Sequence, residues 1–101
     1  MLESLTLAHF VPLVGSSFRV LAEGEVTLIL SSAESLAARK GGRGDQPNGR
    51  EPFDLIFRGP LAPVLPQMIY GLEAEGASAL DVFIVPIGPV DGAMRYQAIF
   101  N

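Results

Sequence analysis

Residues 52–70 read P-F-D-L-I-F-R-G-P-L-A-P-V-L-P-Q-M-I-Y, and this stretch decides the expected fold. Phe53–Phe57 places apolar residues at every second position, which indicates a β-strand with one face in a core. Arg58-Gly59-Pro60 ends that strand. The prolines at 63 and 66 then predict a stiff corner, because proline fixes its own φ angle. Met68–Tyr70 returns to extended structure, so we expect strands arranged around this corner.

The rest of the chain shows the same alternation in further segments joined by short, glycine-containing connections. These segments are Phe18–Ala22, Val26–Ser31, Met68–Ala74, Leu80–Ile87 and Arg95–Phe100. Strands joined this way usually pair antiparallel, and no long helical pattern separates them, which argues against a doubly wound α/β sheet. We therefore predict an all-β fold, a small antiparallel barrel or two-sheet sandwich of about six strands.

Other local signals refine this picture of a single domain over residues 1–101. Leu5–Val14 predicts one short N-terminal helical turn with Thr6 at its N-cap, and Pro12 limits its length. Gly88–Gly92 predicts a turn, and residues 39–50 predict an exposed, mobile loop that is rich in glycine and charge. The expected buried residues are Phe18, Val20, Val26, Leu28, Leu30, Phe53, Leu55, Phe57, Phe83, Val85 and Ile99.

Composition excludes several classes of function. The net charge is −4, and an acidic surface disfavours nucleic-acid binding. The chain has no cysteine, which excludes disulfides and thiolate sites. We expect no cofactor and no membrane partner, since no apolar run is long enough to span a bilayer. The N-terminus has no signal-peptide pattern, which predicts a cytoplasmic protein or one exported without a cleavable signal peptide.

Candidate sites are few. His9 is the one histidine and stands beside a phenylalanine, so a structural role is favoured over catalysis or metal binding. Gly41–Gly44 lacks the lysine of a phosphate-binding loop, and the R-G-D at 43–45 is common by chance.

The more informative set combines a strand end, the proline corner and the last strand: Arg58, Gln67, Tyr70 and Arg95. One interpretation is structural, with Arg58 bonding corner carbonyls and Tyr70 filling the core. The functional interpretation is a pocket for a small carboxylate or a peptide terminus, held by a stiff corner. A further interpretation places this set at an interface.

Several motifs together resemble an uncharacterised bacterial family of about one hundred residues, known only as a domain of unknown function. The motifs lie at residues 10–20, 50–60, 65–72, 83–89 and 95–101, and include R-E-P-F-D-L-I-F-R-G-P, L-P-Q-M-I-Y-G-L, F-I-V-P-I-G-P and R-Y-Q-A-I-F-N. The family often has a histidine after the tyrosine strand, where this chain reads Leu72-Glu73-Ala74-Glu75. Its members tend to occur beside phage-tail-like or secreted-fibre genes, which implies a role in assembly and no particular activity.

Two classes of function fit these observations. The first is a non-enzymatic β-domain that self-associates or docks onto a larger assembly, either phage-tail-like or fibre-associated, using apolar surface or a free strand edge. Its expected interface residues are Phe18, Val20, Tyr96, Ile99 and Phe100. The second is a small-ligand carrier or an enzyme with a pocket near Arg58, Gln67 and Tyr70.

Overall fold

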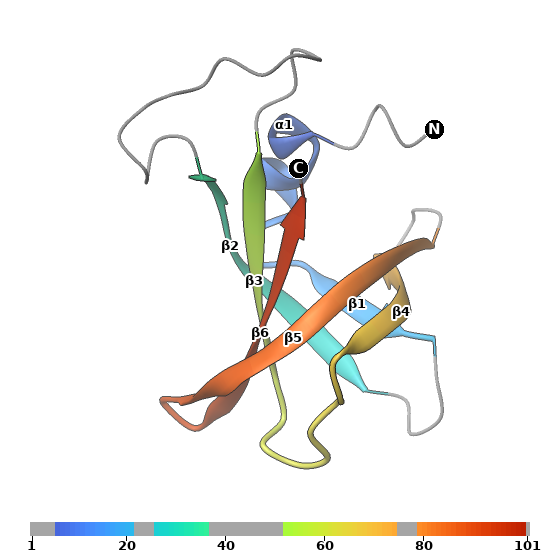
Figure 1. Cartoon of the computed structure of the whole chain (residues 1–101), viewed down its shortest axis with the longest axis vertical. Helices are drawn as coiled ribbons and strands as arrows, with labels where there is room; N and C mark the ends of the chain where they lie inside the picture. Colours follow the sequence, from blue (N-terminus) through green and yellow to red (C-terminus); the bar gives the residue numbers. More distant parts are fainter. Residues whose placement is uncertain (1–5, 22–25, 37–51, 75–78, 101) are drawn as a thin grey trace.

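The computed structural model describes residues 6–21, 26–36, 52–74 and 79–100. Within them, strands form one closed barrel in the order β1-β2-β3-β6-β5-β4, and every neighbouring pair is antiparallel (Figure 1). The strands are β1 Ser17–Val20, β2 Thr27–Ser35, β3 Phe53–Gly59, β4 Met68–Ala74, β5 Leu80–Val90 and β6 Ala93–Phe100. The predicted all-β fold class is confirmed, and of the two predicted architectures the structure has the closed barrel.

A short helix closes one end of the barrel, as the sequence predicts. Helix α1 spans Leu7–Phe10 and continues into the 3₁₀ turn η2, Val11–Leu13. Thr6 occupies the N-cap position, although its side chain makes no capping hydrogen bond. The Phe10 ring is 1% exposed, and its centroid lies 5.8 Å from that of Phe53 and 5.5 Å from that of Phe100. This aromatic contact seals the end at which β3 begins and β6 finishes.

The proline corner between β3 and β4 lies at the other end (Figure 1). Leu65 is the buried residue of this corner, and its backbone N–H donates a hydrogen bond to the Tyr96 hydroxyl at 2.9 Å. Tyr96 itself is fully buried on β6. A buried tyrosine usually finds a partner for its hydroxyl, and here that partner fixes the corner against the barrel wall.

The buried faces of β1, β2 and β3 match the prediction. Phe18, Val20, Val26, Leu28, Leu30, Phe53, Leu55 and Phe57 are all no more than 5% exposed. Their positions alternate along each strand, as the pleat requires when one face lines a core.

The predicted inward faces of β5 and β6 are wrong. Phe83 is 49% exposed and Ile99 is 54% exposed. Val85 is half-buried and lies on the same outward face of β5 as Phe83. Val82 and Ile84 point inward from β5 instead, because the register pairs Val82 with the buried Tyr70. On β6 the inward positions belong to Tyr96 and Ala98, which pair with the buried Phe57 and Leu55.

The turn after β5 is shorter than the sequence predicts. Strand β5 continues through both of its prolines to Val90. Its register with β6 shifts between Pro86 and Gly88, and this irregularity accommodates a proline that has no backbone N–H to donate. Only Asp91 and Gly92 form the loop, and their φ angles are 53° and 80°. Two positive φ angles in a two-residue Asp-Gly loop are the requirement of a type I′ hairpin.

Closure of the barrel corrects the expectation of a free strand edge. Strand β1 pairs with β2 and β4, and β6 pairs with β3 and β5. Both strands proposed for strand addition therefore have their backbone groups engaged on two sides. The predicted mobile loop at residues 39–50 lies outside the described residues. No helix in the described part of the chain is long and apolar enough to cross a membrane.

Candidate functional site

Arg58 and Arg95 are directly opposite each other on the outer wall of the barrel. They are register partners on β3 and β6, so their side chains leave the same face of the sheet. Neither side chain has a hydrogen bond or an ion pair among the described residues. Arg19, by contrast, is paired with Glu73 across β1 and β4. The structure thus brings together two of the four predicted ligand-binding residues.

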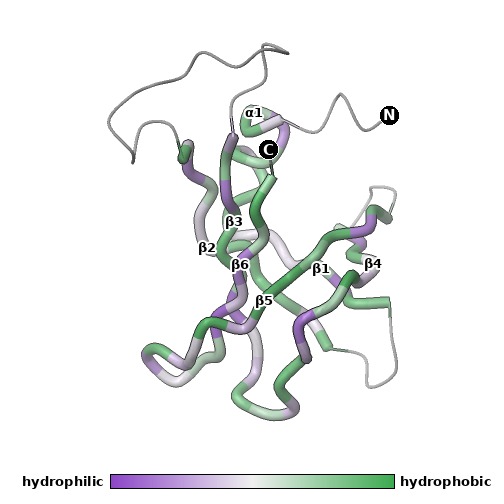
Figure 2. The backbone as a smooth tube through the Cα atoms, in the orientation of Figure 1, coloured by the Kyte–Doolittle hydropathy of each residue, from purple (hydrophilic) through white to green (hydrophobic). Residues whose placement is uncertain are grey.

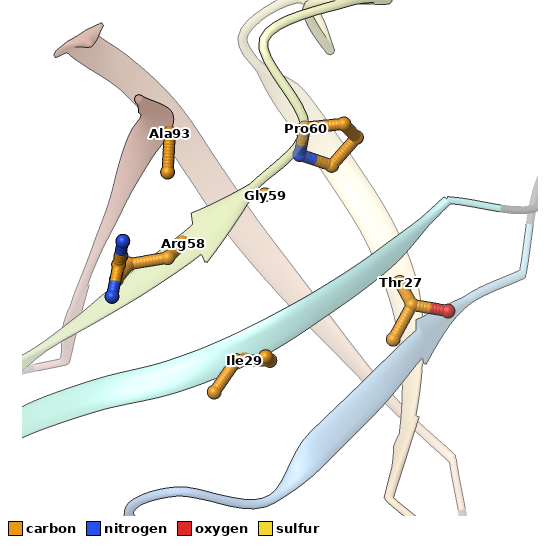
Figure 3. A pocket seen from close by; sticks show the side chains of 6 residues that line it. All are labelled: Thr27, Ile29, Arg58, Gly59, Pro60 and Ala93. Carbon is orange, nitrogen blue, oxygen red and sulfur yellow. The ribbon is translucent and has the colours of Figure 1, made fainter. Parts of the chain in front are cut away.

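A hollow of about 300 Å³ lies beside Arg58 on this wall. Figure 3 shows the side chains around it, with the Arg58 guanidinium extending away from Pro60. The lining comes from β2, from the end of β3 and from the start of β6, and consists of Thr27, Ile29, Arg58, Gly59, Pro60 and Ala93. One charged group and one hydroxyl therefore accompany an otherwise apolar lining. We call this feature, together with Arg95, the arginine hollow.

Arg95 carries a buried donor without an acceptor. Its Nε atom is inaccessible to solvent and has no hydrogen-bond partner. Next along the outer face of β6, the Gln97 side-chain amide donates to Asp54 Oδ2 at 2.8 Å, so that amide already has a carboxylate partner. An unsatisfied buried donor costs about 1–3 kcal/mol, which makes Arg95 Nε an unusual group in a folded chain.

The other two predicted ligand-binding residues lie elsewhere. Strands β3 and β4 occupy opposite positions in the ring of strands, so Tyr70 is separated from Arg58 by the width of the barrel. Tyr70 is 8% exposed, and its hydroxyl donates to the Pro66 carbonyl at 2.8 Å. Gln67 is exposed at the corner before β4. Tyr70 thus has the structural role that the sequence left open.

The raised pKa of the Tyr70 phenol predicts how the stability of the fold changes at alkaline pH. Burial, reinforced by nearby Tyr96, raises the pKa of the Tyr70 phenol above its ordinary 10.0. A folded chain that holds a proton more tightly has its full stabilisation below the unfolded pKa and loses it as pH rises through the folded pKa. We expect Tyr70→Phe to lose less unfolding free energy than wild type between about pH 8 and about pH 11. Equal losses in urea unfolding would contradict this assignment.

Three predicted interface residues are not available at the surface. Phe18, Val20 and Tyr96 are no more than 2% exposed and belong to the core. Their side chains face inward because each occupies one of the alternating strand positions that point into the barrel. Ile99 is exposed, whereas Phe100 is partly buried and stacks on Phe53 with ring centroids 4.8 Å apart.

An exposed apolar surface that the sequence did not indicate lies on the opposite wall. Ile69 on β4 and Phe83 on β5 are register partners and are 62% and 49% exposed. Leu21 is 47% exposed and follows β1, and its N–H donates to the Gly71 carbonyl at 2.8 Å. Figure 2 shows the hydrophobic colouring along β5 in this region. We call Leu21, Ile69 and Phe83 the outer apolar patch.

The remaining candidates do not assemble into a site. His9 is exposed, and its ring packs edge-on against Phe10 at 4.9 Å. No group of three metal-ligating side chains occurs among the described residues. The glycine-rich and R-G-D motifs at 41–45 lie outside the part of the chain that the structure describes.

Comparison with known proteins gives one match. A family model described as Domain of unknown function (DUF6916) matches residues 5–100. No curated protein and no solved structure matches the chain. The fold and the two surfaces described above are therefore the basis for any statement about function.

Proposed function

Because the chain belongs to this family of unknown function, whose description assigns no activity, we propose from its surface that it is a non-enzymatic association domain. Its outer apolar patch contacts another protein, and in the first instance another copy of the chain. Placement in a phage-tail-like or secreted-fibre assembly is part of this proposal and rests on the family resemblance alone.

The observation that carries the proposal is the exposed cross-strand pair Ile69–Phe83 beside Leu21. Directly opposed side chains on one sheet face lie about 4.5–5.5 Å apart at Cβ, so these groups form one continuous surface. Leu21 extends this surface over Gly71, which lies two residues after Ile69 on β4. A Cβ atom built on Gly71 would lie 3.5 Å from both Cβ and Cδ1 of Leu21. Clustered exposed apolar groups of this kind usually mark contact sites with partners. Since the barrel has no free edge at β1 or β6, contact through a sheet face replaces the strand addition expected from the sequence.

The geometry around Arg58 favours this proposal over the alternative class, a carrier or an enzyme with a pocket near Arg58, Gln67 and Tyr70. Tyr70 faces the core and Gln67 lies at the corner, so neither lines the hollow beside Arg58. Ligand binding by the arginine hollow is a separate question that does not need these two residues.

Sedimentation velocity at tens of micromolar concentration tests the proposal. We expect wild-type protein to sediment as an oligomer and the double variant Ile69→Lys/Phe83→Lys to sediment as a monomer. Two charges placed in a desolvated contact should weaken association by at least about tenfold.

The control is Val11→Lys, since Val11 is 52% exposed on η2, which contacts β2, the strand opposite β5 in the ring. It should leave the oligomer intact. A wild-type chain that is monomeric across the concentration range, or equal dissociation by Val11→Lys, would reject self-association through this surface.

A further inference from the structure

We propose that the arginine hollow binds a carboxylate group attached to a small apolar body. Arg58 and Arg95 would hold the carboxylate, and the apolar lining would contact the body of the ligand. This site lies on the β2–β3–β6 wall, across the barrel from the outer apolar patch. The proposal is therefore independent of association through that patch, and each can fail while the other stands.

The first argument is the charge of the pair. Like charges directly opposed across two strands destabilise a sheet unless a counter-charge relieves them. The described neighbours on either side supply none, because Arg58 faces Ile29 on β2 and Arg95 faces Gly88 on β5. The ion pair of Arg19 with Glu73 shows how the same barrel satisfies an arginine elsewhere on its outer wall. An anion between Arg58 and Arg95 would remove the repulsion.

The second argument is the buried Nε atom of Arg95, which has no acceptor. Because Nε is enclosed by the barrel wall, the N–H groups of Arg95 that a ligand can reach are those at the end of its side chain. A guanidinium presents its N–H groups in a planar fork that matches two carboxylate oxygens. A carboxylate in the hollow beside Arg58 would accept hydrogen bonds from these outer N–H groups of Arg95, the register partner of Arg58.

The third argument is the composition and size of the hollow. Besides Arg58, its polar side chain is the Thr27 hydroxyl, while Ile29, Pro60 and Ala93 present apolar groups. Its volume of about 300 Å³ is at the lower limit of small-molecule sites. This lining suits a branched aliphatic group next to a single negative charge. The net charge of −4 makes an extended polyanion a poor partner, because most of the molecule would repel it.

Two sources of such a ligand share this chemistry, the C-terminal carboxylate of a polypeptide and a free small carboxylic acid. Titration of ¹⁵N-labelled full-length chain, followed by amide chemical shifts, tests both. The probes are N-acetyl-valine, which mimics a chain terminus, 3-methylbutanoate as a free acid, and N-acetyl-valinamide, which lacks the carboxylate. We expect saturable shifts at Thr27, Gly59 and Ala93 with at least one acid. Tighter binding of N-acetyl-valine assigns the site to a chain terminus, and tighter binding of 3-methylbutanoate assigns it to a small acid.

Variants connect the binding to the two arginines. Arg58→Gln and Arg95→Gln should each weaken binding by about tenfold or more, as expected for loss of a charge-assisted hydrogen bond. The matched control is Arg19→Gln, which removes the same charge from the outer wall but from an arginine that already has a partner. It should bind the acids as wild type does, and the dispersed amide spectrum of each variant reports that the barrel is intact.

Four outcomes overturn the proposal. They are no saturable shift with either acid, equal binding of N-acetyl-valinamide, equal binding of inorganic phosphate at the same ionic strength, and equal loss of binding in Arg19→Gln.

Discussion

Phe57→Ala should reduce the free energy of unfolding by about 3–5 kcal/mol, as truncation of a buried aromatic does. Phe57 is 1% exposed, and its ring meets that of Phe18 edge-on at 5.4 Å. Its register partners Leu30 and Tyr96 are also fully buried, so the space left by the ring would lie between well-packed walls. Chemical denaturation followed by circular dichroism measures the loss.

The matched control for this prediction is Phe83→Ala, the same truncation on the outer face of the barrel. Phe83 is 49% exposed, so its removal should cost less than about 1 kcal/mol. The pair of variants therefore tests the corrected orientation of β5 directly. If Phe83→Ala proved as costly as Phe57→Ala in monomeric protein, the inward face of β5 would have to be the one predicted from the sequence.

The number of strands could be predicted because each strand carries a local signal, whereas their order in the barrel, in which β3 pairs with β6, could not. Phe53–Phe57 alternates cleanly, and the glycines and prolines that follow mark its end without reference to the rest of the fold. Short connections then require antiparallel neighbours. The choice between barrel and sandwich depends on whether the first strand reaches the fourth, a long-range pairing of β1 with β4 that has no local signature.

The inward face of β5 could not be predicted from alternation. Residues 82–87 read V-F-I-V-P-I, so both parities of the strand are apolar. The register with β4 decides between them, because Tyr70 pairs with Val82 while Ile69 pairs with Phe83. The same ambiguity occurs on β6, where Ile99 and Ala98 are both apolar and Ala98 is the inward residue. On both strands the larger of two adjacent apolar side chains is the exposed one, whereas the larger one would ordinarily be expected in the core.

The sequence indicates two residues of the candidate site, Arg58 and Arg95, whereas the others that line the hollow carry no signal of their own: Thr27, Ile29, Gly59, Pro60 and Ala93. Arg58 and Arg95 could each be selected from the sequence as basic residues on strands, next to a corner and near the chain end. Their direct opposition depends on the register of β3 with β6, which is fixed by contacts such as Leu55 with Ala98. Tyr70 was grouped with them through sequence proximity to the corner, although the ring of strands separates it from Arg58.

Gly59→Ala should reduce the free energy of unfolding by about 1–3 kcal/mol, as overpacking of a core does. Gly59 ends β3 on the inward parity, and a Cβ there would lie 2.6 Å from Leu28 Cδ2 and 3.4 Å from Tyr96 Cε1. Both neighbours are fully buried, so a shift of either side chain would disturb the packing of the core. Displacing Tyr96 would also strain its hydrogen bond to Leu65, so the corner should loosen together with the strand end.

The control is Gly71→Ala, a glycine in the middle of β4 that faces outward. A Cβ at Gly71 would meet Leu21 atoms at 3.5 Å, an ordinary contact distance, and its backbone is outside the left-handed region. Alanine there should be neutral or should stabilise by up to about 1 kcal/mol, since it restricts the unfolded chain. Denaturant midpoints of the two variants measure the difference. Gly59→Ala as stable as Gly71→Ala would mean that Leu28 and Tyr96 pack less closely around the end of β3 than the structure places them.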